Sequence, residues 1–208
     1  MIAFQGTSIF RNGTNVFGYR RPTIGTTFTL ITTAAGSFSG SLSVAIDAAN
    51  NRFFVANSSN STVSILNLTT LALIQVITTA EGSFNFSRSI AIDAANNRFF
   101  VANNSNSTVS ILNLTTLALI QVITPAGGSF NGSAGIAIDA ANNRFFVVNN
   151  TNSTVSILNL TTLALIQVIT TAEGSFNGSL GIAVDAANNR FFVANNSNST
   201  VSILNYTN

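Results

Sequence analysis

Sequons for N-linked glycosylation are the most frequent chemically meaningful pattern in this chain. Sixteen of its 29 asparagines are followed, two positions later, by Ser or Thr. A sequon carries sugar in an exported protein, where the asparagine lies in an exposed loop. The pattern predicts an extracellular or cell-surface location, with covalent N-linked glycans as partners. The candidate attachment sites are Asn12, Asn57, Asn60, Asn67, Asn85, Asn103, Asn106, Asn113, Asn131, Asn149, Asn152, Asn159, Asn177, Asn195, Asn198 and Asn205.

Other side chains that carry chemistry are scarce. The chain has no Cys and no His, which excludes disulfides, the usual zinc sites, and Ser-His-Asp or Cys-His nucleophiles. Charged residues make up 7% of the sequence, against about 25% in ordinary soluble domains. The net charge is +2 and the basic residues cluster only at Arg20-Arg21, so no nucleic-acid interface is expected. We predict a non-enzymatic protein without catalytic residues, cofactor or metal.

An internal repeat of 46 residues positions these side chains. The four aspartates lie 46 residues apart, and residues 94–113 are identical to residues 186–205. Each repeat contains four strand-like runs separated by turn residues. The runs are apolar on both faces, which is typical of a sheet that lies between other sheets. The sequence therefore predicts an all-β, four-bladed β-propeller with one blade per repeat. In the first repeat the runs are 43–46, 52–56, 62–66 and 71–77.

The two ends of the chain predict how the propeller closes. The last repeat stops after its third run, and the missing fourth run is found near the N-terminus, where residues 28–38 align with residues 74–84. An N-terminal strand that completes the last blade would remove exposed sheet edges. We therefore expect residues 27–33 to pair with the strand that contains residues 201–204. The alternative is a parallel β-solenoid with two coils per repeat, which would have no use for a displaced strand.

Up-and-down strands also predict where the sequons lie. The loops between second and third runs should share one face with the loops that lead into the next blade. The turns after the first and third runs should lie on the opposite face. Asn57, Asn60 and Asn85, with their equivalents, would then crowd one face, and Asn67 with its equivalents would lie alone on the other.

The repeat resembles a known family. The segments GIAVD (181–185), RFFVAN (190–195) and STVSILN (199–205) are similar to the YVTN-type β-propeller repeat, which reads G-I-A-V-D, R-Y-V-A-N and N-T-V-S-V-I-D. The match covers all four repeats, and it implies a propeller fold, often in surface or secreted proteins. The Pro-Asp-Gly turn usual in the family is replaced by Ala-Ala-Asn-Asn. The site residues of the family's enzymes have no counterpart here, so the resemblance implies no activity.

Nearly all charges of the blades belong to Asp–Arg pairs that flank a short turn. We expect each pair to form a cross-strand ion pair while the Asp also accepts bonds from the turn amides. A sharper hypothesis places the four Asp in a ring around the central channel, where they would bind a cation such as Ca²⁺. The neighbouring arginines argue against that hypothesis. The pairs are Asp47 with Arg52, Asp93 with Arg98, Asp139 with Arg144, and Asp185 with Arg190.

Two further residue types recur in the loops between blades. Glu81 and Glu173 occupy equivalent positions, and we expect them to be solvated loop residues rather than a glycosidase pair. A phenylalanine ends each of these loops, where it can fill the space between blades or, if exposed, stack on sugars. The four are Phe38, Phe84, Phe130 and Phe176.

The predicted domains are an N-terminal arm, residues 1–24, and the propeller, residues 25–208. The arm is too apolar for a disordered tail, and Asn12-Gly13 is a hairpin-turn signal. It can fold back over its own propeller, or it can cross to the next molecule by β-augmentation and make a head-to-tail filament. Its apolar residues are Ile2, Phe4, Ile9, Phe10, Val16, Phe17 and Tyr19.

These features predict a function without chemistry. No apolar run approaches the roughly 20 residues of a membrane span, and the first six residues lack the pattern of a secretory signal. The hypothesis they favour is a glycosylated extracellular structural protein, a homopolymer subunit of a filament or surface layer assembled through its arm. The alternative is a multivalent lectin or adhesin with four equivalent sugar sites between the blades.

Overall fold

The computed structural model describes residues 7–12, 15–20 and 29–206. The chain divides into two compact units, residues 1–30 and residues 31–208. The predicted boundary between residues 24 and 25 lies outside the described residues. In the part of the chain that the structure describes, no helix is long and apolar enough to cross a membrane.

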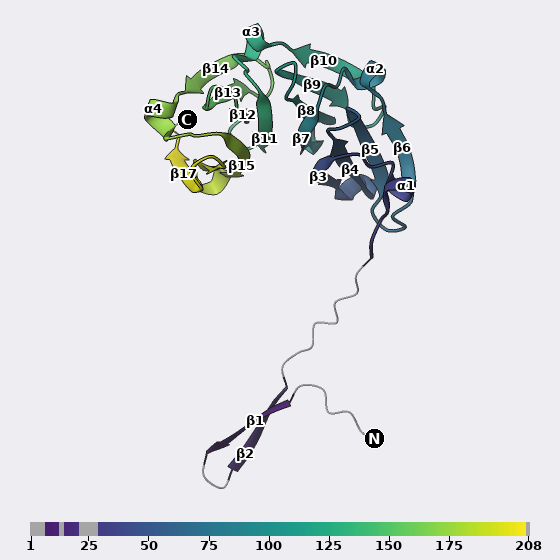
Figure 1. Cartoon of the computed structure of the whole chain (residues 1–208), viewed down its shortest axis with the longest axis vertical. Coiled ribbons are helices and arrows are strands. Elements are labelled where there is room, and N and C mark those ends of the chain that lie inside the picture. Colours follow the sequence, from purple (N-terminus) through teal and green to yellow (C-terminus); the bar gives the residue numbers. More distant parts are fainter. Residues whose placement is uncertain (1–6, 13–14, 21–28, 207–208) are drawn as a thin grey trace. The chain divides into compact units, whose positions relative to one another are not determined.

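The larger unit consists of four antiparallel sheets, one for each repeat (Figure 1). Strands follow one another in chain order within each sheet, and strands of different repeats are not hydrogen-bonded into one sheet among the described residues. The predicted all-β, four-bladed propeller is confirmed, and the solenoid is excluded. Blade 1 contains β3 (Ser41–Asp47), β4 (Arg52–Asn57), β5 (Thr62–Asn67) and β6 (Leu73–Ile77). Blade 2 contains β7 (Ser87–Asp93), β8 (Arg98–Asn103), β9 (Thr108–Asn113) and β10 (Leu119–Ile123). Blade 3 contains β11 (Ser133–Asp139), β12 (Arg144–Asn149), β13 (Thr154–Asn159) and β14 (Leu165–Ile169). Blade 4 contains β15 (Ser179–Asp185), β16 (Arg190–Asn195) and β17 (Thr200–Asn205).

Short helical turns connect these strands. The turn between the first and second strands ends on an asparagine in the left-handed region, as at Asn51, whose φ is 50°. Asparagine tolerates this conformation better than most residues, which explains the Ala-Ala-Asn-Asn sequence of the turn. Three of these turns are 3-10 helices: η1 (Ala48–Asn50), η2 (Ala94–Asn96) and η3 (Ala186–Asn188). Each blade is entered through a four-residue helix: α1 (Thr33–Gly36), α2 (Thr79–Gly82), α3 (Pro125–Gly128) and α4 (Thr171–Gly174).

The hydrophobic core lies between the blades. Phe54 of blade 1 packs on Phe99 of blade 2, with ring centroids 4.9 Å apart, and Phe100 and Phe145 repeat the contact between blades 2 and 3 at 5.0 Å. Both faces of the second strand are therefore buried, as their apolar sequence predicted. At each of the three interfaces, a similar cluster of Ile, Val and Leu side chains surrounds the phenylalanine rings.

The recurrent loop phenylalanines belong to this core. Phe84, Phe130 and Phe176 are buried between successive blades, so their predicted space-filling role is confirmed. Each ring lies against the glycine two residues before it. A Cβ added to Gly128 would lie 2.0 Å from the ring of Phe130, which leaves no room for a side chain there.

The predicted closure by residues 27–33 is wrong in the part that the structure describes. Residues 29–32 form no strand, Thr33 begins α1, and β17 pairs with β16 alone among the described residues. Residues 27–28 lie outside the described residues. Blade 4 thus has three strands, and the four blades form an open arc (Figure 1). The physical reason is that three similar steps from blade to blade do not return the chain to its first blade.

The smaller unit contains one hairpin. β1 (Thr7–Asn12) pairs antiparallel with β2 (Asn15–Arg20), and Asn12 lies opposite Asn15 at the turn. The predicted hairpin at Asn12-Gly13 is therefore confirmed. Its strands carry five of the seven predicted arm residues: Ile9, Phe10, Val16, Phe17 and Tyr19. Ile2 and Phe4 lie outside the described residues.

Candidate functional site

Hydrogen bonds between loops confirm which sequons share a face. Thr79 Oγ1 donates to the Ser61 carbonyl at 2.9 Å. This bond joins the loop between β4 and β5 to the loop that enters blade 2. On the opposite face, the backbone N–H of Leu68 donates to the Asn51 carbonyl at 2.9 Å. The loops therefore divide between two faces as the up-and-down strands predicted.

Four of the sequon asparagines lie inside the protein. Asn57, Asn103, Asn149 and Asn195 each end the second strand of a blade, and all are buried. Asn103 shows the arrangement. Its Nδ2 donates to Thr108 Oγ1 at 3.1 Å and to Ser110 Oγ at 2.9 Å, while its Oδ1 accepts from the Asn85 N–H at 3.4 Å. One buried amide thus ties the two loops of this face to the third strand.

Burial removes these four from the candidate attachment sites. A glycan replaces a hydrogen on the same amide nitrogen that donates to Thr and Ser inside the blade. The folded blade has no room for a sugar at that nitrogen, and the hydroxyls would lose their buried partner. The sequence could not separate these asparagines from the exposed ones, because both kinds satisfy the sequon.

A second set of four sequon asparagines lies three residues further on and is exposed. In each, the Thr hydroxyl of the sequon donates to the side-chain oxygen of its own asparagine, as from Thr108 Oγ1 to Asn106 Oδ1 at 2.9 Å. This bond turns the oxygen inward and fixes the amide group at the loop surface. The set consists of Asn60, Asn106, Asn152 and Asn198.

The remaining sequons take three positions. Asn113 is half-buried on the opposite face, where its Oδ1 accepts from the N–H groups of Thr115 and Thr116 at 2.9 and 2.8 Å. Asn67 and Asn159 repeat this turn. Asn12 is the last residue of β1 in the hairpin unit. The others are exposed: Asn85, Asn131, Asn177 and Asn205.

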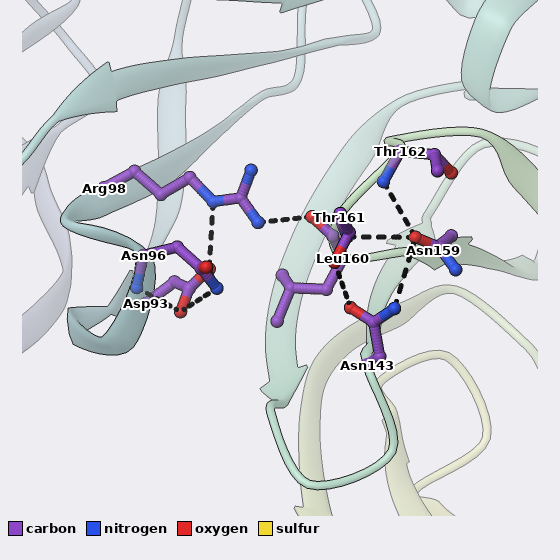
Figure 2. A network of polar contacts seen from close by, with 8 residues as sticks. All are labelled: Asp93, Asn96, Arg98, Asn143, Asn159, Leu160, Thr161 and Thr162. Atoms are coloured by element: carbon purple, nitrogen blue, oxygen red, sulfur yellow. Dashed lines mark hydrogen bonds and ion pairs between the residues drawn. The ribbon is translucent and has the colours of Figure 1, made fainter.

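The Asp–Arg pairs are structural and reach across blades (Figure 2). Asp93 accepts from Arg98 Nε at 2.9 Å and from the side chain of Asn96, which confirms the predicted ion pair and turn bonds. Arg98 also donates through Nη2 to the carbonyl of Leu160 in the next blade. This second bond was not predicted. It fixes the spacing of neighbouring blades at their turn-bearing face.

The same pair recurs in blades 1 and 4. Asp47 accepts from Arg52 Nε at 2.9 Å, and Arg52 donates to the Leu114 carbonyl of blade 2. In blade 4, Asp185 lies 2.8 Å from Arg190. The Asn188 side chain, followed by Arg190, holds the pKa of Asp185 below its ordinary value.

The predicted ion pair between Asp139 and Arg144 is wrong: the two described side chains form none, because Tyr206 takes the arginine's place as the partner of Asp139 in blade 3. Tyr206 stands where blades 2 and 3 carry Leu114 and Leu160, and its hydroxyl donates to Asp139. The guanidinium of Arg144 lies over the Tyr206 ring, 5.2 Å from its centroid. Burial, together with the bond to Asp139, raises the pKa of Tyr206 to about 12. The phenol therefore stays protonated at neutral pH and remains a donor.

The hypothesis of an Asp ring around a cation finds no support in this geometry. Each carboxylate is held in its own hairpin by Asn, Arg or Tyr donors. Among the described residues, no three carboxylates come together as ligands for one ion.

The two loop glutamates serve as helix caps. Glu81 Oε2 accepts from both the N–H and the hydroxyl of Thr78 at 2.7 Å, and Glu173 does the same with Thr170. The backbone bond and then the hydroxyl bond lower the pKa of each glutamate. Both are exposed, as predicted for loop residues, but their capping role was missed although the Thr-x-x-Glu spacing signals a capping box.

A shallow pocket of about 330 Å³ lies against the first strands of all four blades. Arg88 carries the only charge among the residues that line it, beside Ser43 and Ser89. Gly135 is required there because a Cβ would lie 2.6 Å from the Leu180 carbonyl. The residues that line the pocket include no nucleophile paired with a base.

Comparison with known proteins supports the fold and leaves the family open. No protein-family model matches the sequence, and no curated protein matches it significantly. Similar solved structures include hydrazine synthase from Kuenenia stuttgartiensis, at 13% identity and a TM-score of 0.68, covering 90% of this chain and 49% of that chain. The β-propeller domain of Cps50 (Swd1) from Myceliophteria thermophila is 11% identical with a TM-score of 0.63, covering 80% and 54%. The WD40 repeats of RRP9 are 9% identical with a TM-score of 0.60, covering 79% and 51%. The chain therefore spans about half the length of the solved propeller chains that it resembles.

Proposed function

We propose that this protein is a non-enzymatic, glycosylated structural protein of the extracellular space. One observation carries the proposal: the Asp, Arg and buried Asn side chains of the blades bond to the scaffold itself at equivalent positions of the repeat, with Tyr206 in place of an arginine as the partner of Asp139 in blade 3. Asp93, Arg98 and Asn103, for example, bond only to turns, strands and neighbouring blades among the described residues. Catalysis usually requires one asymmetric constellation of reactive groups. The likeness to hydrazine synthase concerns the fold alone at 13% identity.

Glycans coat the loop faces in this proposal. We expect N-linked sugar at the exposed set Asn60, Asn106, Asn152 and Asn198, and none at the buried set Asn57, Asn103, Asn149 and Asn195. Both sets occur in the same loops, so each buried residue is the matched control for its exposed neighbour. Site-localised glycopeptide mass spectrometry on protein from its natural source measures the difference. Sugar at the buried asparagines, or its absence from all exposed ones, contradicts the proposal.

The N-terminal hairpin is the proposed assembly element. Its backbone register pairs Phe10 with Phe17. We propose that this hairpin binds the next molecule and joins subunits head to tail in a filament or surface layer.

Removing the hairpin tests this proposal. Deletion of residues 1–20 should abolish fibres in negatively stained electron micrographs, because the linking strands are gone, while circular dichroism retains the β signal. A full-length Phe10→Asp variant tests the same hairpin, and Thr7→Asp, at an alternate position of the same strand, is its control. If fibres persist unchanged in both the deletion variant and Phe10→Asp, the hairpin does not link the subunits.

The lectin alternative loses its main support. Its aromatic platforms were to come from the recurrent phenylalanines, of which Phe84, Phe130 and Phe176 are buried and Phe38 is half-buried. Phe86 is 37% exposed, but Gly40, Gly132 and Gly178 stand at the equivalent positions, so it supplies no fourfold site. Titration showing four bound sugars per chain would favour this alternative over the structural proposal.

A further inference from the structure

Each blade has two apolar faces that pack on its neighbours. The forward face of a blade is formed by residues of its second and third strands that contact the next blade. In blade 1 these residues are Phe54, Ala56, Val63 and Ile65. The receiving face contacts the preceding blade, and in blade 2 it includes Ile90, Phe99, Val101 and Leu112. Forward and receiving faces meet in the same way at all three interfaces within the arc.

The forward face of blade 4 is uncovered. Val201 and Ile203 are each 61% exposed, whereas Val155 and Ile157 at the same positions of blade 3 are 0% and 2% exposed. Ala194 of the same face is exposed as well. Blade 4 repeats blade 2 without a change from residue 186 to residue 205, so this face has the residues that elsewhere bind a receiving face.

The receiving face of blade 1 is uncovered at its first strand, although Phe53, Val55 and Leu66 further along this face are buried. Val44 is 60% exposed, whereas Ile90 and Ile136 at the same position are 5% and 6% exposed. Below it, Phe53 and Val55 pack on Ile31 and Phe38. Those two residues stand where Ile77 and Phe84 stand at the next interface. Blade 1 therefore already has the contacts of an interface at Phe53 and Val55, but lacks the contacts that would bury Val44.

Polar groups at the two free faces also match. Arg52 and Arg98 donate to the Leu114 and Leu160 carbonyls of the following blade. Arg190 is the equivalent donor in blade 4, and its side chain is 42% exposed, against 13% for Arg98. The carbonyl equivalent to its missing acceptor belongs to Leu68 of blade 1. The two free faces therefore also carry a hydrogen-bond donor and an acceptor at equivalent positions.

We propose that the forward face of blade 4 docks on the receiving face of blade 1 of a second copy of this chain, and that two copies close one ring. Two arcs of four blades give a ring of eight. A head-to-tail interface of this kind closes when its rotation returns to the start. The proposal deepens the structural function proposed above by naming a partner surface, but it does not depend on the hairpin.

The size of the arc favours a second copy over closure within one chain. The arc superposes on about half of a complete propeller domain, covering 54% of that chain. Its blade-to-blade steps are therefore those of a ring with about twice as many blades. A second arc supplies the missing half without altering any of the three interfaces, whereas closure on itself would have to change all of them.

Site-directed cross-linking tests the proposed interface, because the chain has no Cys of its own. Ser43 Oγ and the Ile90 N–H lie 3.2 Å apart across a filled interface. The equivalent residues at the free faces are Gly181 and Val44. We expect full-length Gly181→Cys chains mixed with Val44→Cys chains to form a disulfide-linked dimer on oxidation, and neither variant to do so alone. A Cys at 181 fits, since its Cβ would meet only Ala194 at 3.8 Å.

A matched control and a second variant make the outcome decisive. The Ser43→Cys, Ile90→Cys double variant should form a disulfide within one chain, which shows that the geometry permits the bond. Failure of the mixed chains to cross-link while this control succeeds overturns the proposal. So does a Gly181→Cys, Val44→Cys double variant that forms only monomers with an internal disulfide, since the chain then closes on itself. If this double variant forms disulfide-linked oligomers longer than dimers, the two-copy closed ring is overturned.

Sedimentation gives an independent measurement. In the Phe10→Asp background, which is expected to form no fibres, the chain should sediment at twice its 21.7 kDa, and adding Ile203→Asp should return it to a single chain. Ile74→Asp is the control, because Ile74 is 54% exposed on an outer strand away from both faces. The Phe10→Asp variant should still cross-link at 44 and 181. Loss of fibres with cross-linking retained, or the reverse, separates the failure of one proposal from failure of the other.

Discussion

Replacing Phe100 by Ala should destabilise the protein by about 3–5 kcal/mol, the usual cost of truncating a fully buried phenylalanine. Phe100 is completely buried between blades 2 and 3, with its ring 5.0 Å from that of Phe145. It also lies under the guanidinium of Arg98, at 5.3 Å from the ring centroid. The truncation leaves a cavity at the centre of an interface that cannot collapse without moving a whole blade. Urea unfolding of the full chain, followed by circular dichroism, measures the loss.

Phe192 provides the matched control because it occupies the same position of the repeat. Arg190 covers its ring at 5.4 Å, just as Arg98 covers that of Phe100, but no following blade of the chain packs on it in the described structure. Phe192→Ala should therefore cost only about 1 kcal/mol at low protein concentration. If a second copy docks on blade 4, this cost should rise as the concentration increases. Equal losses for Phe100→Ala and Phe192→Ala in dilute solution would contradict the described core.

The sequence was sufficient to predict the blades because their signals are local and repeat without insertions. The Asp and Arg that flank each first turn predicted the ion pair that forms in blades 1, 2 and 4. Runs with apolar residues on both faces predicted strands buried on both sides. These features depend on neighbours within a few residues or in the adjacent strand, so four copies of one pattern gave four sheets.

The closure of the ring could not be predicted, because it depends on the angle of rotation from one blade to the next. The spacing of the repeats in the sequence does not determine that angle. The alignment of residues 28–38 with residues 74–84 predicted a strand that completes the last blade, whereas Ile31 and Phe38 pack against blade 1. Whether the preceding strand also reaches β17 depends on how far each blade rotates from the last. Side-chain volume between the blades sets that rotation. The bonds from Arg52 and Arg98 to carbonyls of the next blade could not be predicted for the same reason.

The loop asparagines show the limit for a candidate site. In Asn103-Asn104-Ser105-Asn106-Ser107-Thr108, the first and the fourth residues both begin sequons. Strand register separates them: Asn103 pairs with Thr108 at the end of the β8–β9 hairpin, while Asn106 lies at its tip. A polar residue closing a hairpin beside Ser and Thr could have been suspected of bonding inward. Whether Asn103 is buried, however, depends on the loop from the preceding blade, which contains Asn85.

Asn103→Leu should therefore destabilise the protein by on the order of 3 kcal/mol, because it leaves several buried polar groups without partners at about 1–3 kcal/mol each. Ser110 Oγ and Thr108 Oγ1 lose the donor Nδ2, and the N–H of Asn85 loses its acceptor. Leucine is similar in volume, so little of the loss would come from a cavity. Asn106→Leu is the matched control in the same loop, and as an exposed substitution it should change stability by less than about 0.5 kcal/mol. Urea unfolding of both variants, produced without glycosylation, separates the structural role from any effect of sugar. If Asn103→Leu unfolds at the same urea concentration as Asn106→Leu, the buried amide does not hold the two loops together, and its exclusion from the glycan sites loses its physical basis.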